Sequence, residues 1–148
     1  MVSPHFAAIK KSGMNMQQFM TLSSLIEREG VNQTDRRKMA GVLLNRIDIN
    51  MPLQSDVAVL YAIHRNNKVL TNKDLQSDSP YNLYKYTGFG PGPFDSPSIS
   101  SMSAVLHPLD RSKNYLYFVA NTKTKKVYYS KTYAEHQQQI AAHTSDNN

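Results

Sequence analysis

Glu27 and Glu29 stand two residues apart in the run SLIEREG, residues 24–30, and the 148-residue chain contains only one other glutamate, Glu135. Both lie within an otherwise apolar helical pattern. Burial in such a pattern disfavours the ionised carboxylate and raises its pKa, which is how proteins make a general acid that is protonated near neutral pH. The pattern therefore predicts a carboxyl acid catalyst in this run.

The spacing of the apolar residues does not choose between the two glutamates. At about 100° per residue, Glu27 falls inside the apolar arc, next to Met20. Glu29 falls on the same arc, between Leu22 and Leu25. A structural task, such as a cap on a neighbouring helix or an ion pair with one of the 17 lysines and arginines, explains the same placement.

The composition is that of one ordinary globular domain. The chain has 148 residues and 40% hydrophobic content, enough to bury about two-thirds of the surface that the unfolded chain exposes. It contains no cysteine, and its five histidines show no HxxxH or HExxH spacing. We therefore expect neither a metal nor another cofactor. No apolar run approaches the ~18 residues that span a bilayer.

The net charge of +6 predicts a polyanionic partner. Nucleic acid is one candidate, but the basic residues are spread along the chain, with short clusters only at 36–38 and 123–126. Neither cluster resembles a recognition helix. A bacterial cell wall, rich in anionic polymers, satisfies the same charge, so nucleic acid ranks last among the expected partners.

Periodicity and turn signals predict several helices packed around a small antiparallel sheet, an α+β domain over residues 14–143. Two β-prone runs, at 115–120 and 126–130, flank a polar loop and predict a C-terminal β-hairpin. The segments expected to be helical are 14–29, stopped by Gly30; Thr34, as a cap, to Ile47; 57–64; a short helix capped by Thr71; Ser96 or Ser98 to Pro108; and 132–143.

The two ends of the chain are expected to lie outside this domain. Residues 1–13 lack strong periodicity, and we interpret them as an N-terminal segment, either the end of a preceding part of the chain or an expression remnant. Residues 144–148 are expected to form a disordered tail.

The stretch from 77 to 97 has a composition of its own. It holds four of the seven prolines, three of the six glycines and five aromatic residues. One interpretation is an ordered groove wall for a hydroxyl-rich ligand, since aromatic rings stack on the apolar faces of sugars. A proline-braced loop with its aromatic residues folded into the core explains the composition equally well.

Seven motifs, taken in order, resemble one protein family. Together they cover about residues 20–140 and resemble the YceG-like, or MltG-type, endolytic murein transglycosylases, most closely those of Gram-positive bacteria. The motifs are SLIEREG (24–30), AGVLLNRI (40–47), MPLQSD (51–56), LYAI (60–63), DSPYNLYKYTGFGPGPFDSPS (78–98), YLYFVAN (115–121) and YAEH (133–136).

The resemblance implies roles for individual residues. Glu27 matches the catalytic acid of the family, which leaves Glu29 as a supporting carboxylate, together with Glu135 and His136. The residues implied to form the substrate-binding groove are Asn45, Arg46, Gln54, Ser55, Asp56, Ser79, Tyr81, Asn82, Tyr84 and Gly92.

The resemblance also implies a reaction, cleavage of the β-1,4 bond between N-acetylmuramic acid and N-acetylglucosamine to leave a 1,6-anhydro end. Glu27 would act first as acid and then as base, so one carboxyl group suffices, whereas hydrolysis normally needs two. Two alternatives stay open. One is a hydrolysing muramidase that pairs Glu27 with Asp56 or Asp78, and the other is an inactive peptidoglycan-binding or divisome scaffold module.

Members of the family usually carry a transmembrane helix and a LysM-like module before this region. The resemblance therefore implies a fragment of a single-pass membrane protein that works on the extracytoplasmic face of the cell membrane. The implied partners are peptidoglycan strands and proteins of cell-wall synthesis, and the membrane would be reached only through the missing helix.

Overall fold

The computed structural model describes residues 6–27, 32–54, 73, 76, 79, 82–84, 87–88, 97–121 and 123–144. These residues form α-helices, a short 3-10 helix and a two-stranded antiparallel sheet, which confirms the predicted α+β class. The elements in chain order are α1 (Phe6–Lys11), α2 (Met16–Glu27), α3 (Gln33–Asp48), α5 (Ile99–Leu106), η3 (Arg111–Lys113), β1 (Tyr117–Ala120), β2 (Val127–Ser130) and α6 (Tyr133–His143).

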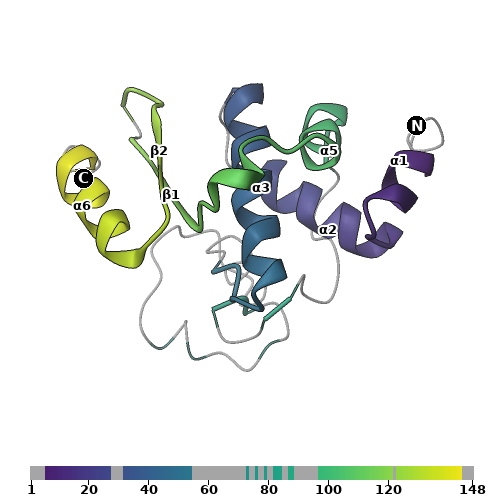
Figure 1. Cartoon of the computed structure of the whole chain (residues 1–148), viewed down its shortest axis with the longest axis horizontal. Coiled ribbons are helices and arrows are strands. Elements are labelled where there is room, and N and C mark those ends of the chain that lie inside the picture. The colour runs from purple at the N-terminus through teal and green to yellow at the C-terminus, as the bar shows by residue number, and fades with distance from the viewer. Residues whose placement is uncertain are drawn as a thin grey trace.

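Helices α2, α3 and α5 pack against one another and enclose the core (Figure 1). The apolar stripes predicted for α2 and α3 face inward, because residues three and four apart share one side of a helix. Burying each large apolar side chain stabilises the fold by roughly 1.5–3 kcal/mol. Among the core residues of these helices are Phe19, Leu22, Ile26, Met39, Leu43, Met102 and Val105.

Helix α1 was not predicted. Its Ile9 is buried and belongs to the same core cluster as the side chains of α2 and α3. A six-residue helix contributes too few core positions to leave a readable period.

The caps of the later helices lie where short polar side chains precede the apolar pattern. Ser98, one of the two predicted candidates, caps α5, and its Oγ accepts the Ser101 N–H at 3.3 Å. Thr132 caps α6 in the same way. For α3 the predicted cap, Thr34, is wrong. Asn32 is the cap, because its Oδ1 accepts the Asp35 N–H at 2.8 Å and its Nδ2 donates to the Asp35 carboxylate.

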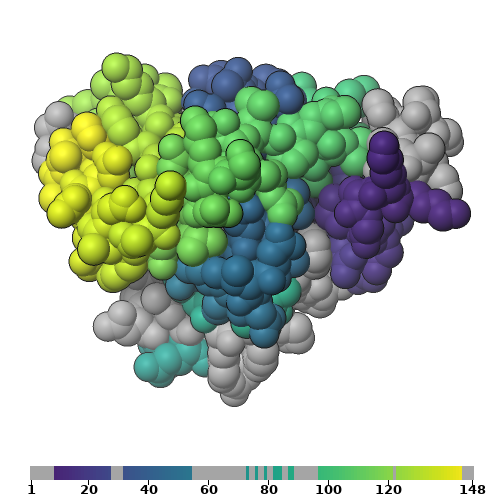
Figure 2. Space-filling model, in the orientation of Figure 1, coloured from purple at the N-terminus to yellow at the C-terminus, as the bar shows by residue number. Residues whose placement is uncertain are grey.

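The predicted hairpin is confirmed, with Tyr117 opposite Ser130 and Ala120 opposite Val127. Asn121 shapes the connecting turn, since its Oδ1 accepts the N–H groups of Lys123 and Thr124. Helix α6 packs on both strands. Figure 2 shows α6 and the hairpin, in yellow and yellow-green, at one end of the visible face, and α1, in purple, at the other.

Several predicted features lie outside the described residues. They are the stop at Gly30, the helix at 57–64, the cap at Thr71 and the tail from 145 to 148. Among the helices that the structure does describe, none combines the length and apolar character needed to cross a membrane.

Candidate active site around Glu27

Glu27 is the last residue of α2, and its half-exposed carboxylate lies against the start of α5. Its Oε1 accepts two hydrogen bonds, one from the backbone N–H of Ser98 at 2.6 Å and one from the hydroxyl of Ser101 at 3.0 Å. The first N–H groups of a helix lack intrahelical partners, and the positive end of the helix dipole favours an anion. Glu27 therefore supplies an acceptor and a negative charge where α5 needs both.

These contacts set the ionisation of Glu27. Hydrogen bonding by Ser98 is the main cause that holds the pKa of the carboxyl below its ordinary value. Burial raises the pKa, but Ser101 and the positive charge of Arg36 lower it further. The prediction of a raised pKa is therefore wrong for this conformation. Glu27 sits at the exposed end of the apolar arc, where the donors of α5 stabilise the carboxylate more than burial disfavours it.

The first turn of α3 joins the same region. Gln33 Nε2 donates to the Ser100 carbonyl oxygen at 2.8 Å, and Arg36 Nη1 donates to the side chain of Gln33 at 3.5 Å. The Arg36 Nε atom is buried and finds no hydrogen-bond partner within the described part of the chain. The end of α2 and the starts of α3 and α5 therefore meet around one carboxylate and one guanidinium.

Sequence reasoning missed three of these neighbours as site residues, namely Gln33, Arg36 and Ser101. Ser98 was recognised only as a helix cap. The hydrogen bonds to Glu27 span 71 and 74 positions of the chain, a separation at which no local pattern relates the partners.

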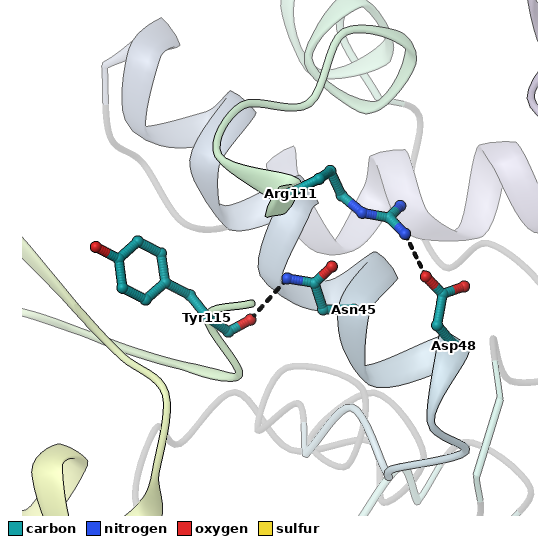
Figure 3. Close-up of polar contacts among 4 residues, drawn as sticks. All are labelled: Asn45, Asp48, Arg111 and Tyr115. Atoms are coloured by element: carbon teal, nitrogen blue, oxygen red, sulfur yellow. Dashed lines mark hydrogen bonds and ion pairs between the residues drawn. The ribbon is translucent and has the colours of Figure 1, made fainter. Parts of the chain in front are cut away.

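Asn45 and Arg46 are buried and hold segments of the fold together. Asn45 Nδ2 donates to the Tyr115 carbonyl oxygen at 3.0 Å, as Figure 3 shows, beside the ion pair between Asp48 and Arg111. These contacts fasten α3 to the chain that leads into β1.

The Arg46 guanidinium satisfies backbone carbonyl groups on two sides. Its Nε donates to the Leu116 oxygen at 2.6 Å, and its Nη1 donates to the Leu53 oxygen at 2.8 Å. It also lies 5.2 Å from the centre of the Tyr117 ring. Burial lowers the pKa of this guanidinium. The expected place of Asn45 and Arg46 in a substrate groove stays a prediction.

The turn after α3 contacts the described part of the proline-rich stretch. The Gln54 N–H donates to the Leu83 carbonyl oxygen at 2.9 Å. Asn82 is fully buried, and its Oδ1 accepts the Tyr84 N–H at 3.2 Å while its own N–H donates to the Ser79 oxygen at 2.9 Å. Four predicted groove residues, Gln54, Ser79, Asn82 and Tyr84, are thus brought together.

Five predicted site residues lie outside the described ranges, and so does Asp78, one of the two candidates for a second carboxylate. The five are Glu29, Ser55, Asp56, Tyr81 and Gly92.

Glu135 and His136 lie on α6, and the polar contacts of Glu27 involve neither. Glu135 is exposed in the first turn, where its N–H donates to Thr132. The His136 ring stacks on Tyr117 with the ring centres 5.0 Å apart. Burial, and next the charge of Arg46, lower the pKa of His136. Across the described residues, no three histidine, aspartate or glutamate side chains gather as a metal site requires.

The sequence profile of the YceG-like family matches residues 2–142. The chain belongs to the YceG-like family. This membership confirms the resemblance drawn from the seven motifs, and it includes α1, because the match begins before that helix.

Two curated relatives of this YceG-like chain carry the name endolytic murein transglycosylase. The protein from Bacillus subtilis (strain 168) is 40% identical over 147 residues, which is 99% of this chain and 40% of the relative. The protein from Streptococcus pneumoniae serotype 2 (strain D39) is 38% identical over 149 residues, 97% of this chain and 27% of the relative. The chain therefore spans less than half the length of either relative.

A crystal structure of a yceG-like protein from Listeria monocytogenes has the same fold. It is 44% identical, with a TM-score of 0.85 over 93% of this chain and 44% of that chain.

Proposed function

We propose that this YceG-like domain is the catalytic part of an endolytic lytic transglycosylase that cleaves peptidoglycan strands, with Glu27 as its acid and base. The observation that carries the proposal is the Glu27 carboxylate itself. It is half-exposed, held through one oxygen at the junction of three helices, in a chain 40% identical to a protein named endolytic murein transglycosylase.

In the first step the protonated Glu27 carboxyl donates its proton to the oxygen of the β-1,4 bond between N-acetylmuramic acid and N-acetylglucosamine. The bond from C1 to that oxygen breaks, and its electron pair leaves with the oxygen as a hydroxyl group. The carbonyl oxygen of the muramic acid's own acetamido group bonds to C1 and takes up the developing positive charge.

In the second step the ionised Glu27 removes the proton from the C6 hydroxyl of the same sugar. O6 then bonds to C1 and displaces the acetamido oxygen, which closes the 1,6-anhydro ring. No water is consumed, and the carboxyl ends the cycle protonated. Because the C6 hydroxyl belongs to the reacting ring, the step has the entropic advantage of an intramolecular reaction.

The lowered pKa of Glu27 places a condition on the first step. The contacts with Ser98 and Ser101 favour the ionised form in the open domain. A glycan strand lying over Glu27 would exclude water, which disfavours the carboxylate and raises the pKa. We therefore expect glycan binding to be accompanied by proton uptake at this residue.

The proposed glycan groove runs along α3. Arg36, in the first turn of this helix, is the charge that acts on Glu27, and the predicted groove residues Gln54 and Tyr84 lie beyond the other end. A helix of 16 residues is about 24 Å long. A strand that contacts both ends must extend over several sugar units, which suits a substrate cut within its length.

The test is digestion of purified peptidoglycan followed by mass spectrometry of the new ends. The parent chain should leave 1,6-anhydro ends, and Glu27→Gln should lose roughly 10²- to 10⁴-fold in rate, because an amide accepts the α5 hydrogen bonds but has no acidic proton. Glu29→Gln is the matched control and should keep measurable activity. Cleavage by Glu27→Gln within a few-fold of the parent would move the acid role to Glu29.

The product masses also decide between the alternatives. Ends that have gained water would indicate a muramidase with a second carboxylate, Asp56 or Asp78, since hydrolysis adds the mass that ring closure does not. Binding without cleavage would indicate a scaffold module. Membrane anchoring of the longer protein, and contacts with cell-wall synthesis proteins, stay predictions.

A further inference from the structure

The start of α5 holds the Glu27 carboxylate through one of its two oxygens. The Ser98 N–H and the Ser101 hydroxyl both donate to Oε1, at 2.6 and 3.0 Å. The Ser98 side chain also hydrogen-bonds to this carboxylate and is the largest cause of its lowered pKa. Among the described residues, the hydrogen bonds with a defined acceptor oxygen both end on Oε1. An oxygen that accepts two hydrogen bonds has both lone pairs engaged, so a proton added to the carboxylate belongs on the other oxygen.

We propose that Ser101 is a positioning residue for Glu27, which together with the Ser98 N–H pins Oε1 to the first turn of α5 and so makes Oε2 the oxygen that exchanges the proton with the glycan. The inference rests on the proposed function of Glu27, and it assigns a separate task to each of the two carboxylate oxygens.

Ser101 is itself firmly placed. Its side chain is fully buried, although it is polar and belongs to a helix whose next residue, Met102, lies in the core. The Ser101 N–H donates to Ser98 Oγ at 3.3 Å, and the Ser98 hydroxyl donates to Ser101 Oγ at 3.4 Å. The cap of α5 therefore continues through Ser101 to Glu27 as one hydrogen-bonded chain, which fixes the direction of the Ser101 hydroxyl.

The charges around Glu27 are few. Helix α5 carries no ionisable side chain in its sequence ISSMSAVL. From α3, Arg36 is the charged residue that acts on Glu27. Removing the Ser101 hydroxyl leaves Arg36 and the Ser98 N–H in place, so a change in the ionisation of Glu27 reports the hydrogen bonds that join Ser101 to Glu27 and to the Ser98 hydroxyl.

The first measurement is an NMR titration of the Glu27 carboxyl carbon in the chain without substrate. Ser101→Ala should raise the pKa of Glu27, because a donor to the ionised form is lost. Ser100→Ala is the matched control, since it makes the same change one residue earlier on α5 at an exposed position, and it should leave the titration unchanged. Ser101→Cys fills the buried volume with a weak donor and should shift the pKa in the same direction.

The second measurement is the pH dependence of glycan cleavage. In Ser101→Ala the alkaline limb of kcat should move to higher pH along with the pKa, and kcat should fall roughly 10- to 100-fold at its optimum, with little change in KM. A residue that only stabilises the fold would change neither the titration nor the position of the limb.

The outcomes separate the two proposals. If both Ser101 variants fold and the Glu27 titration matches that of the parent, the positioning role of Ser101 is refuted whatever the activity. If the titration shifts but the parent chain does not cleave peptidoglycan, the proposed function fails and Ser101 only tunes an ionisation.

Discussion

A single carboxyl group can be recognised from the pattern around it, but its ionisation depends on the atoms it touches. Glu27 stands in an apolar helical run, which indicated a buried acid. In the structure the same residue ends α2 and accepts hydrogen bonds from Ser98 and Ser101. The sign of its pKa shift follows from those donors, because each one stabilises the charged form.

The role of Asn82 likewise depends on the atoms that its side chain contacts. A fully buried amide presents no surface to a ligand, and the Asn82 Oδ1 already accepts the Tyr84 N–H. This placement favours support of the turn over direct contact with a glycan.

Asn82→Ala should therefore lower the free energy of unfolding by roughly 1–3 kcal/mol, since the Tyr84 N–H loses its acceptor and the truncated side chain leaves a void. Urea denaturation measures this change. Gln54→Ala is the comparison, because that side chain is exposed and its backbone bond to Leu83 persists. Unchanged stability of Asn82→Ala together with weakened glycan binding would instead place the amide in the groove.

At the scale of elements, α3 connects the two parts of the domain. Its first turn lies beside α5 and Glu27, and Arg46 in its last turn bonds to the segment that leads into β1. The chain after α5 is hydrogen-bonded to the same helix. Arg37 Nε donates to the His107 oxygen at 2.6 Å, and the Leu109 N–H donates to the Arg37 oxygen at 3.0 Å.

This close approach requires a glycine on α3. A Cβ atom at Gly41 would lie 2.5 Å from the Leu109 carbonyl oxygen, closer than real side chains approach backbone. Replacing glycine by alanine inside a helix ordinarily stabilises it by roughly 0.5–1 kcal/mol.

Gly41→Ala should have the opposite sign and destabilise the fold by roughly 1–3 kcal/mol, because the backbone at Leu109 must shift. Thermal unfolding measures the effect. Thr34→Ala, a substitution at an exposed position of the same helix, is the control. A gain in stability would mean that the segment after α5 can move away from position 41 at no cost in free energy.

At the scale of the whole molecule, one row of stacked groups ties the helical core to the hairpin and α6. The Arg46 guanidinium lies over Tyr117, and the Tyr117 ring stacks on His136. Burial and the charge of Arg46 both disfavour the protonated form of His136 and lower its pKa. The folded state therefore prefers a neutral imidazole at this position.

The sign of the resulting pH dependence follows from that preference. A histidine whose pKa is lowered by folding stabilises the folded state above its unfolded pKa, about 6.5, and this stability is lost as pH falls towards the folded value. The free energy of unfolding should therefore drop as the pH falls below about 6.5. The Glu27 carboxylate also stabilises the folded state, because its pKa is lowered on folding. That contribution is lost only below about pH 4.5, at a lower pH than the contribution of His136.

His136→Phe should keep the stack on Tyr117 and flatten the loss of stability below about pH 6.5. Denaturant unfolding on both sides of that pH tests the prediction, with His107→Gln as the control at an exposed histidine. An equal pH dependence in the parent and in His136→Phe would assign the effect to other groups.

The sequence by itself determined the features that depend on neighbours along the chain. The inward face of α3 with Met39 and Leu43, the start of α5 at one of two serines and the β-hairpin all follow from the spacing of residues within one helix or one turn. The order of the motifs determined the family, and the resemblance implied Glu27 as the acid.

Only the tertiary structure decided what those elements do to one another. It placed Ile9 in the core, joined Arg46 to Leu116 across 70 positions of the chain and turned the start of α5 towards Glu27. It also reversed the expected direction of the Glu27 pKa shift. Hydrogen bonds between distant segments depend on where whole helices pack, and such packing leaves no periodic trace in the sequence around either partner.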